Sequence, residues 1–376
     1  MIFTLIGALS LAVWMVLLFA HHGFWLTAER DTRDMPAEPA IWPEVAAVVP
    51  ARDESDVIAA SVSSLAGQDY GGPLRIIVVD DSSGDGTGRV VRALDLSQVE
   101  VEAGLPLAAG WTGKLWAVSQ GIERAGSSPR YLWLTDADIV HAPDTLRTLV
   151  SRAEAGDLSL VSLMAKLRCE SLAERMLIPA FVFFFQMLYP FARVNSPSGL
   201  GGAAGGCMLV NRRSLETAGG IREIRNALID DCALGALLKR RGRIWLGLTE
   251  RSQSIRRYDD FKAVAAMISR SAYAQLGYSP FLLLATIAGL ALIYAAPLLL
   301  AAFGSGFPRL AGAGAWVLMA IAFQPMLAFY RRSWLWGFAL PVIAAFYAGC
   351  TLLSALQYVR GRGGTWKGRV QTVVGR

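Results

Sequence analysis

The stretch "RYLWLTDADIVHAPDTLRTLVSRAEAG", residues 130–156, changes from one kind of secondary structure to another. Its first part, "RYLWL", is rich in β-forming residues, whereas residues 145–156 have the spacing of an amphipathic helix. Asp136 and Asp138 stand between the two parts, one residue apart. Because like charges this close repel each other, the sequence predicts that a positive group is held between the two carboxylates.

The same alternation of strand and helix runs through the charged part of the chain, from about residue 44 to residue 275. Apolar runs predict strands at 45–49, 74–80, 99–102, 130–136 and 158–164. Helical spacing follows at 56–68, 86–95, 113–126 and 143–156, with Asp56 placed to cap the first helix. Strands that are apolar on both faces and alternate with helices are typical of a mostly parallel sheet covered by helices. The predicted fold class is therefore α/β, with ligands at the carboxyl ends of the strands.

Several common kinds of site are disfavoured. The first strand is followed by "PARDE" (50–54) and not by G-x-G-x-x-G, which argues against a dinucleotide-dependent dehydrogenase. "GWTGKL" (110–115) lacks the first glycine and the Ser/Thr of an ATPase phosphate-binding loop. The four cysteines show no C-x-x-C spacing, so we expect neither a zinc site nor a disulfide framework. A nucleic-acid partner is not expected either.

The composition indicates that part of the chain lies in a lipid bilayer. Hydrophobic residues make up 54% of the sequence, more than in an ordinary soluble domain. Residues 2–20 carry no charge and are long enough to span, and a cleaved signal peptide is disfavoured because no Lys or Arg precedes them. Further apolar spans are predicted at about 280–303, 311–330 and 334–358. The predicted organisation is an N-terminal anchor (1–22), a globular domain (44–275), a C-terminal membrane region (280–358) and a basic tail (359–376).

Basic residues gather near the ends of the predicted spans, at 239–243, at Arg256 and Arg257, and at 331–332. The positive-inside tendency then places the globular domain of this multi-pass membrane protein in the cytoplasm. One span before the domain and three after it would put the basic tail outside, against the same tendency. We therefore expect one late segment to be re-entrant or interfacial, and the sequence does not decide which.

The acidic residues at the predicted strand ends favour a cation site. Alternate residues of an extended D-x-D point to one face, so Asp136 and Asp138 can reach one Mg²⁺ or Mn²⁺, which prefers oxygen ligands and bridges carboxylates to substrate phosphates. The alternative is a solvated strand end. Glu54, Asp80 and Asp81 end the first two strands, and acidic groups facing one cleft repel each other unless a ligand or cation joins them.

Five motifs in order resemble the family 2 glycosyltransferases of the GT-A fold. They are "VVPARDE" (48–54), "VVDDSSGDGT" (78–87), "GWTGKLWAVSQG" (110–121), "LTDAD" (134–138) and "IDDCALGALLKRRG" (229–242). Longer stretches, among them "LVSLMAKLRCES" (160–171), "AAGGCMLV" (203–210) and "GGTWKGR" (363–369), are similar to the hopene-associated glycosyltransferases of hopanoid biosynthesis. The resemblance implies a Rossmann-like GT-A catalytic domain flanked by N-terminal and C-terminal transmembrane helices.

The resemblance also implies which residues bind a nucleotide-sugar donor, with a UDP-sugar as the expected one. The positions that match the family's base, ribose and diphosphate sites are Pro50, Arg52, Glu54, Asp80, Asp81, Lys114, Asp136 and Arg270. The resemblance assigns Mg²⁺ or Mn²⁺ to Asp138, helped by Asp136. Gly205 and Gly206 would line the donor-sugar pocket, where glycine permits a close approach of the backbone.

By the same resemblance, Asp231 is the catalytic base and Asp230 is the weaker candidate. Inverting transfer needs one base on the acceptor hydroxyl and one electrophilic group on the leaving diphosphate, and no enzymic nucleophile. Acids at a helix N-terminus also favour the helix dipole, and both interpretations of this pair can hold. Polymerising family members carry Gln/Arg-x-x-Arg-Trp, whereas residues 267–271 read "MISRS", so we expect transfer of a single sugar. Arg270 is alternatively an interfacial residue.

The segment 176–192, "MLIPAFVFFFQMLYPFA", is too short to span comfortably. It is either a buried core helix or an interfacial segment beside the active site, and the predicted membrane anchors favour the interfacial segment. A membrane lipid acceptor, with a hopanoid as the leading candidate, explains why a sugar transferase would be tethered to the bilayer. The alternatives are a polyprenyl phosphate, a carotenoid or another lipid as acceptor, or a non-catalytic component that binds sugar nucleotides or transports lipid.

Overall fold

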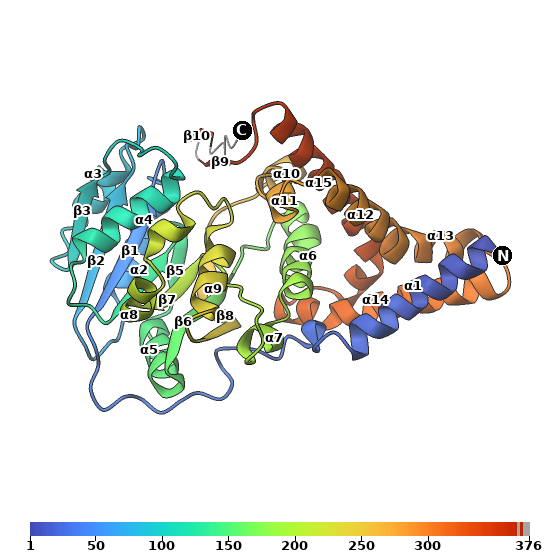
Figure 1. The fold of residues 1–376 in the computed structure, drawn as a ribbon, viewed down its shortest axis with the longest axis horizontal. Coiled ribbons are helices and arrows are strands. Elements are labelled where there is room, and N and C mark those ends of the chain that lie inside the picture. The colour runs from blue at the N-terminus through green and yellow to red at the C-terminus, as the bar shows by residue number, and fades with distance from the viewer. Residues whose placement is uncertain (367–368, 371–376) are drawn as a thin grey trace. The chain divides into compact units, whose positions relative to one another are not determined.

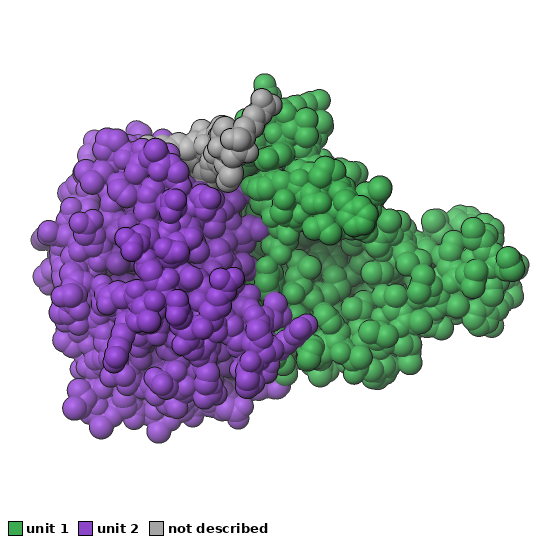
Figure 2. All heavy atoms as spheres, viewed as in Figure 1, with its two compact units in different colours: residues 1–28, 169–192, 258–364 green, residues 29–168, 193–257, 365–376 purple. Residues whose placement is uncertain are grey.

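The computed structural model describes residues 1–366 and 369–370, and the chain forms two compact units (Figure 2). The sheet unit comprises 29–168, 193–257 and the described residues after 364, and the helical unit comprises 1–28, 169–192 and 258–364. The basic tail that the sequence predicts over 359–376 lies partly outside the described residues.

The sheet unit is built on an eight-stranded sheet of order β3-β2-β1-β4-β7-β6-β8-β5 (Figure 1). Its strands are β1 (Val45–Ala51), β2 (Leu74–Asp80), β3 (Val99–Ala103), β4 (Tyr131–Thr135), β5 (Ile139–His141), β6 (Leu158–Lys166), β7 (Cys207–Asn211) and β8 (Arg243–Ser254). Strands β3, β2, β1 and β4 are mutually parallel, as are β6 and β8. Strand β7 is antiparallel to both neighbours, and β5 is antiparallel to β8. The predicted α/β class with a mostly parallel sheet is confirmed, although β5, β7 and β8 were not predicted.

Four helices of the sheet unit lie where the sequence predicts them: α2 (Ile58–Ala66), α3 (Thr87–Arg92), α4 (Gly113–Arg124) and α5 (Thr145–Gly156). The helical spacing does not predict α7 (Phe191–Asn195), α8 (Arg212–Thr217), the 3-10 turn η2 (Ile221–Ile224) or α9 (Asp230–Lys239), although Asp230 and Asp231 allow a helix start there. The prediction that Asp56 caps the first helix is wrong. Helix α2 begins at Ile58 with Val57 at its N-cap, and the backbone oxygen of Glu54 accepts from the amides of both residues.

The core of the sheet unit has helices on both faces of the sheet. Val45, Ala47 and Val49 belong to the buried cluster that includes side chains of α2 and α5. The residues between them on β1 point the opposite way, because side chains of a strand alternate. There Gly121 brings α4 close to the sheet, since a Cβ at this position would lie 2.4 Å from Cγ1 of Val48. A larger residue at 121 would push α4, and the site residue that it carries, away from β1.

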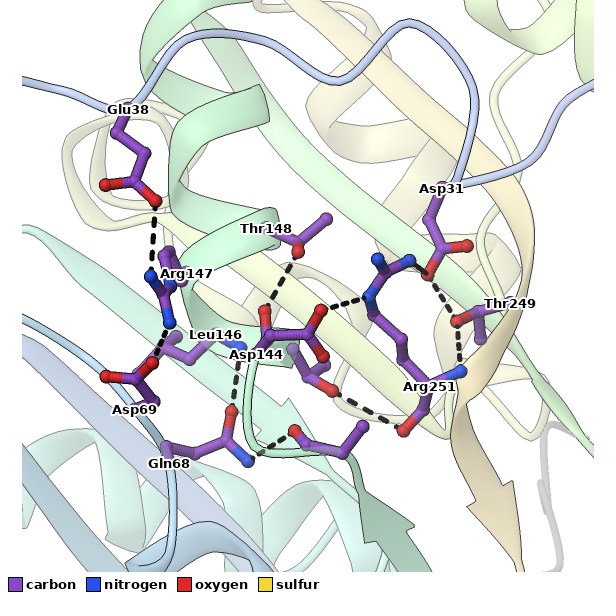
Figure 3. A network of polar contacts seen from close by, with 12 residues as sticks. Asp31, Glu38, Gln68, Asp69, Asp144, Leu146, Arg147, Thr148, Thr249 and Arg251 are labelled. Carbon is purple, nitrogen blue, oxygen red and sulfur yellow. Dashed lines mark hydrogen bonds and ion pairs between the residues drawn. The ribbon is translucent and has the colours of Figure 1, made fainter.

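The segment before β1 is an ordered part of the sheet unit (Figure 3). Its backbone pairs with β8, where the amide of Asp31 donates to the oxygen of Leu248 at 3.1 Å. The Asp31 carboxylate is buried, accepts a hydrogen bond from Thr249 and lies 3.2 Å from Nη1 of Arg251. Arg251 also donates from Nε to Asp144 at 2.9 Å. This network fastens residues 29–31 to β8 and to the start of α5.

The helical unit carries four helices that are long and apolar enough to cross a membrane, among the residues that the structure describes. They cover Ile2–Phe19, Pro280–Phe303, Phe307–Phe329 and Trp334–Val359, close to the four predicted spans. The elements are α1 (Ile2–Phe19), η1 (Phe24–Leu26), α6 (Leu172–Leu188), α10 (Phe261–Ser269), α11 (Ala272–Gln275), α12 (Pro280–Leu290), the π-turn η3 (Ala291–Ala295), α13 (Ala296–Phe303), α14 (Phe307–Phe329), η4 (Trp334–Ala339) and α15 (Leu340–Val359). Strands β9 (Thr365–Trp366) and β10 (Arg369–Val370) follow and pair antiparallel.

Most of the segment 176–192 belongs to α6, which packs within the helical unit. Ser171 and Glu174 form a capping box at its start. Phe183 is completely buried, with ring centroids 5.3 Å from Phe24 and 5.2 Å from Phe323. For Phe183 the structure favours the core-helix interpretation over exposure at a membrane surface. Leu188, at the end of the same helix, is 55% exposed.

Candidate active site

One lysine joins the D-x-D motif to the acidic pair of α9. Nζ of Lys114 lies 2.8 Å from Oδ1 of Asp136 and 3.0 Å from Oδ2 of Asp230. Lys114 sits in the first turn of α4, Asp136 directly follows β4, and Asp230 is the first residue of α9. Three segments that are far apart in the sequence therefore converge on one ammonium group.

Asp231 is held beside this cluster by backbone amides. Its Oδ2 accepts from the amide of Gly205 at 2.9 Å, and its Oδ1 accepts from the amide of Cys232 at 2.7 Å. Burial and the charge of Asp230 raise the pKa of Asp231 to about 6, although Lys114 and the two amides act in the opposite direction. A carboxylate with this pKa can accept a proton near neutral pH, as a general base must.

The remaining charges of the cluster depend on each other. Burial raises the pKa of Asp136, while its contact with Lys114 opposes this effect. Burial would lower the pKa of Lys114, but Asp136 and Asp230 outweigh it and hold that pKa above its ordinary value. Lys114 is therefore a permanent cation. With one lysine against three aspartates, the cluster favours a further positive charge.

Asp138, the second acid of the D-x-D, is held by the end of β8. Its Oδ2 accepts from Oγ of Ser254 at 2.7 Å and from Nε of Arg256 at 3.2 Å. The Nη2 group of Arg256 also lies 2.6 Å from Oε1 of Glu54, which follows β1. A guanidinium therefore joins Glu54 and Asp138, two acidic residues that the sequence predicts at the strand ends.

The D-x-D carboxylates offer a partial ligand set for a divalent cation. Among residues 1–366 and 369–370, no group of three or more His, Cys, Asp or Glu side chains is arranged to hold a metal ion. Lys114 contacts Oδ1 of Asp136, and Ser254 and Arg256 contact Oδ2 of Asp138. Two carboxylate oxygens suit a hard cation that takes its other ligands from phosphates and water. The donor set thus fits Mg²⁺ or Mn²⁺ bound together with a nucleotide diphosphate.

A buried histidine supports the strand that carries the D-x-D. Nε2 of His141 lies 2.9 Å from Oγ1 of Thr135, and its Nδ1 lies 2.9 Å from Oγ of Ser252 on β8. Thr135 in turn donates to the backbone oxygen of Gly206 at 2.8 Å. Burial lowers the pKa of His141 to about 3, so the ring is neutral and acts as a hydrogen-bond bridge. This series of hydrogen bonds fixes the end of β4 immediately before Asp136.

The predicted nucleotide-binding residues lie at the ends of β1 and β2. Arg52 donates to the backbone oxygen of Asp81, and its Nη1 lies 3.7 Å from the Asp81 carboxylate. Asp80 accepts from the amide of Ser83 at 3.0 Å, which shapes the turn after β2. Pro50 lines a small pocket, and the site residues that share it are Lys114, Asp136, Gly205 and Asp230.

Gly206 and Arg270 lie apart from the other predicted site residues. Gly206 faces the sheet, where a Cβ would lie 3.0 Å from Cβ of Ala165, so packing is what requires a glycine there. A Cβ at Gly205 would lie 3.3 Å from Oδ2 of Asp231, so this is the glycine next to the acidic cluster. Arg270 is the exposed C-cap of α10 in the helical unit, and its role at the diphosphate remains a prediction.

The sequence motifs do not identify Arg256, Ser254 and His141 as members of the site. In the sequence, Arg256 is only a basic residue near a predicted membrane span, whereas the structure pairs it with Asp138 and Glu54. The signal was the apolar alternation in "RIWLGL" (243–248), which indicates a strand. That signal ends at residue 248, and the extension of the strand to Ser254 depends on its pairing with β6 and β5.

The comparison with known families agrees with this geometry. Residues 46–219 match the family model described as "Glycosyl transferase family 2". The matched range runs from Ala46 in β1 through β7 and includes the D-x-D and Lys114, while Asp230, Asp231 and Arg256 lie beyond it. Over these residues the match supports the predicted family. The predicted enzyme class, a glycosyltransferase, is confirmed.

One solved structure shows the same fold over almost the whole chain. A mannosyltransferase from Pyrobaculum calidifontis, solved in complex with GDP-Man and Mn²⁺, is 19% identical, with a TM-score of 0.57 over 94% of this chain and 99% of that one. This similarity confirms the GT-A fold. Glucosyl-3-phosphoglycerate synthase from Mycobacterium tuberculosis is also 19% identical, with a TM-score of 0.40 over 62% of this chain and 79% of its own.

A curated relative shares a shorter stretch. An N-acetylglucosaminyltransferase from Neorhizobium galegae is 50% identical over 52 residues, which is 14% of this chain and 12% of that protein. The match therefore covers only a small part of that protein.

Proposed function

We propose that the protein transfers one sugar from a nucleotide-sugar donor to a membrane lipid, with inversion at the anomeric carbon and with a divalent cation. The observation that carries this proposal is the position of Lys114, whose Nζ contacts Asp136 at 2.8 Å and Asp230 at 3.0 Å. It supports a single site in which the leaving diphosphate would lie on the side of Asp136 and the base on the side of Asp231.

The donor would bind across the ends of β1, β2 and β4. Pro50, Arg52 and the turn that begins at Asp80 would surround the base and ribose, and Lys114 would face the diphosphate. The uracil base rests on the resemblance of the motifs to their family, and GDP-Man in the Pyrobaculum structure is a property of that protein. A panel of UDP- and GDP-sugars therefore belongs in the first experiment.

Asp136 and Asp138 would hold the Mg²⁺ or Mn²⁺. When bound, such a cation neutralises charge that builds up on the departing diphosphate. Lys114 adds a fixed positive charge on the same side. Its contacts with Asp136 and Asp230 place the ammonium before the donor arrives, and such preorganised charge is the main way in which active sites stabilise a leaving group.

Asp231 would take the proton from the acceptor hydroxyl as the oxygen attacks the anomeric carbon. Its pKa of about 6 leaves the carboxylate mostly ionised at pH 7 and still basic enough to accept a proton. Asp230 contributes by raising that pKa and by holding Lys114. One base and one electrophilic side suffice for a single displacement, which inverts the anomeric centre.

The acceptor is proposed to be a lipid of the bilayer, with a hopanoid as the class that the resemblance indicates. Support comes from four helices of the helical unit that are long and apolar enough to span a membrane. In the window of Pro280–Phe303 only 11% of the residues are buried inside the protein, which suits a helix that faces lipid. The positive-inside tendency further supports an inner-membrane protein whose sheet unit, which makes up most of the proposed domain 44–275, faces the cytoplasm.

The deciding experiment uses the full chain in lipid nanodiscs with Mn²⁺. UDP-GlcNAc, UDP-glucose and GDP-mannose are each supplied with a hopanoid polyol, with a polyprenyl phosphate or without an acceptor. The masses of the lipids are then measured by mass spectrometry. We expect a mass gain of one sugar on the hopanoid. A gain on the polyprenyl phosphate alone would overturn the acceptor, and binding of a donor without a gain on any lipid would overturn the enzymatic proposal.

A further inference from the structure

Arg256 is built into the site as a bridge between two acidic residues from different strands. It follows Ser254, the last residue of β8, by two positions. Its Nη2 lies 2.6 Å from Oε1 of Glu54, and its Nε lies 3.2 Å from Oδ2 of Asp138. The side chains of Glu54 and Asp138 are 8% and 12% exposed, whereas that of Arg256 is 30% exposed. The guanidinium is therefore the part of this triad that is most open to solvent.

Without a positive charge between them, the two carboxylates would repel each other in surroundings that screen charge weakly. A guanidinium suits this position because its planar fork can reach two acceptors at once and keeps its charge at any relevant pH. The same fork binds phosphate oxygens in pairs. Arg256 thus has the chemistry both to hold the empty site together and to pair with an anionic ligand.

We propose that Arg256 is a displaceable counter-ion: it holds Glu54 and Asp138 before the donor binds, leaves Asp138 when a divalent cation binds there, and then pairs with the diphosphate of the nucleotide. The inference rests on the proposed function, because it assumes a nucleotide diphosphate and a cation at the D-x-D. It adds a residue that couples the binding of the two and predicts that the cation binds weakly until the nucleotide is present.

The contacts explain this coupling. A cation on Asp138 would stand within a few ångströms of the guanidinium that already uses Oδ2 of that carboxylate, and two positive charges at such a distance repel each other. In the absence of nucleotide, no diphosphate oxygen is available to replace the contact of Arg256 with Asp138. When the diphosphate supplies new acceptors, the lost contact with Asp138 is replaced, so the nucleotide and the cation should bind with positive cooperativity.

The first test measures Mn²⁺ binding to the full-length protein in nanodiscs without nucleotide, from the electron paramagnetic resonance signal of free Mn²⁺. Arg256→Gln removes the competing charge and should bind Mn²⁺ about tenfold more tightly than the unmodified chain, within the usual range of coupling between sites. The matched control is Arg257→Gln, since Arg257 is the exposed neighbour. Equal or weaker Mn²⁺ binding by Arg256→Gln would overturn the proposal.

The second test measures the affinity for UDP at saturating Mn²⁺. If Arg256 pairs with the diphosphate, Arg256→Gln should weaken UDP binding about tenfold, the weight of a lost charge-assisted contact. Arg257→Gln should leave it unchanged. Unaltered UDP affinity in Arg256→Gln would disprove the transfer of the guanidinium to the diphosphate.

Thermal unfolding of each variant shows whether a change in affinity comes from a loss of folded protein. Arg256→Gln removes the cation that Glu54 and Asp138 share, so the Tm should fall. Mn²⁺ should restore more of the lost Tm in this variant than it adds to the unmodified chain. Arg256→Lys keeps the charge but lacks the fork, so it should show a smaller gain in Mn²⁺ affinity and a smaller loss in UDP affinity. Arg256→Lys with both affinities unchanged would count against the bridge. If the unmodified chain binds no nucleotide, the proposed function fails, whereas unchanged Mn²⁺ affinity in a chain that binds UDP defeats only the role of Arg256.

Discussion

Nζ of Lys114 lies 3.0 Å from Oδ2 of Asp230, so the ammonium that pairs with the D-x-D also pairs with the first acid of α9. Asp231, the next residue, is thereby placed within the field of the same lysine, which lowers its pKa against the effects of burial and Asp230. The protonation of the proposed base is therefore linked to the charges that would face the donor.

Replacing the proposed base should separate binding from transfer. Asp231→Asn keeps the shape of the side chain and should still bind UDP-sugar, but transfer should fall by about 10²-fold or more, the usual contribution of a positioned general base. Single-turnover transfer and UDP-sugar binding are measured on the same preparation.

The control for this change is Asp95→Asn, at an exposed position with a φ of 49° that asparagine also tolerates. It should keep full transfer. Full turnover by Asp231→Asn would assign the proton to Asp230 or to another group, and loss of donor binding together with transfer would mean that Asp231 serves the structure of the pocket.

The acidic limb of the pH–rate profile should follow Asp231. Since the base acts when ionised, transfer should rise with pH through about 6 and level off above it. Asp230→Asn removes the neighbouring negative charge that raises the pKa of Asp231, so the limb should move to lower pH. The profile of kcat is measured with saturating donor and Mn²⁺. A limb that keeps its position in Asp230→Asn would exclude Asp231 as its origin.

Lys114→Met should move the same limb in the opposite direction. The lysine lowers the pKa of Asp231, and its loss leaves Asp136 and Asp230 without their shared partner. The limb should therefore shift to higher pH and the affinity for UDP should fall. Lys114→Arg keeps the charge and should show a smaller change in both. Identical profiles in Lys114→Met and the unmodified chain would show that the contact has no catalytic weight.

The buried ion pair of the segment before β1 should matter more for stability than an exposed one nearby. Asp31→Asn leaves Arg251 with a lost partner in a buried network and should reduce the free energy of unfolding by about 3–5 kcal/mol. Glu38 pairs with Arg147 and its side chain is 57% exposed. Glu38→Gln breaks this contact and should reduce the free energy of unfolding by less than about 1 kcal/mol. Both are measured by denaturant unfolding, and equal losses would show that residues 29–31 are not fastened to β8.

The sequence predicted the parts of the fold that rest on local patterns. Strands β1, β2, β4 and β6 are apolar runs bounded by helices, and a continuous apolar run is the signal of a strand buried on both faces. Strand β7 follows a glycine-rich stretch, and β5 has three residues, so neither stands out in the sequence. The antiparallel position of β7 depends on its pairing with β4 and β6, which no local pattern specifies.

The candidate site divides in the same way. Asp136, Asp138, Asp230 and Asp231 stand in recognisable motifs, so their residue types revealed them. The role of Lys114 as a bridge depends on where α4 and α9 begin in space. The role of Arg256 depends on β8 ending next to β5, the strand that directly follows Asp138. Such contacts between distant segments are set by packing, and a single sequence does not display them.

Phe183 belongs to the segment 176–192, for which the sequence allows either a core helix or a membrane interface. Its ring is completely buried among Phe24, Phe184 and Phe323, so Phe183→Ala should reduce the stability of the helical unit by about 3–5 kcal/mol. Leu188→Ala is the control on the same helix, because a side chain that is 55% exposed leaves little cavity. Thermal unfolding in detergent and transfer to lipid are measured for both. Unchanged stability of Phe183→Ala with selective loss of transfer would show that this ring contacts the acceptor and is not part of the core.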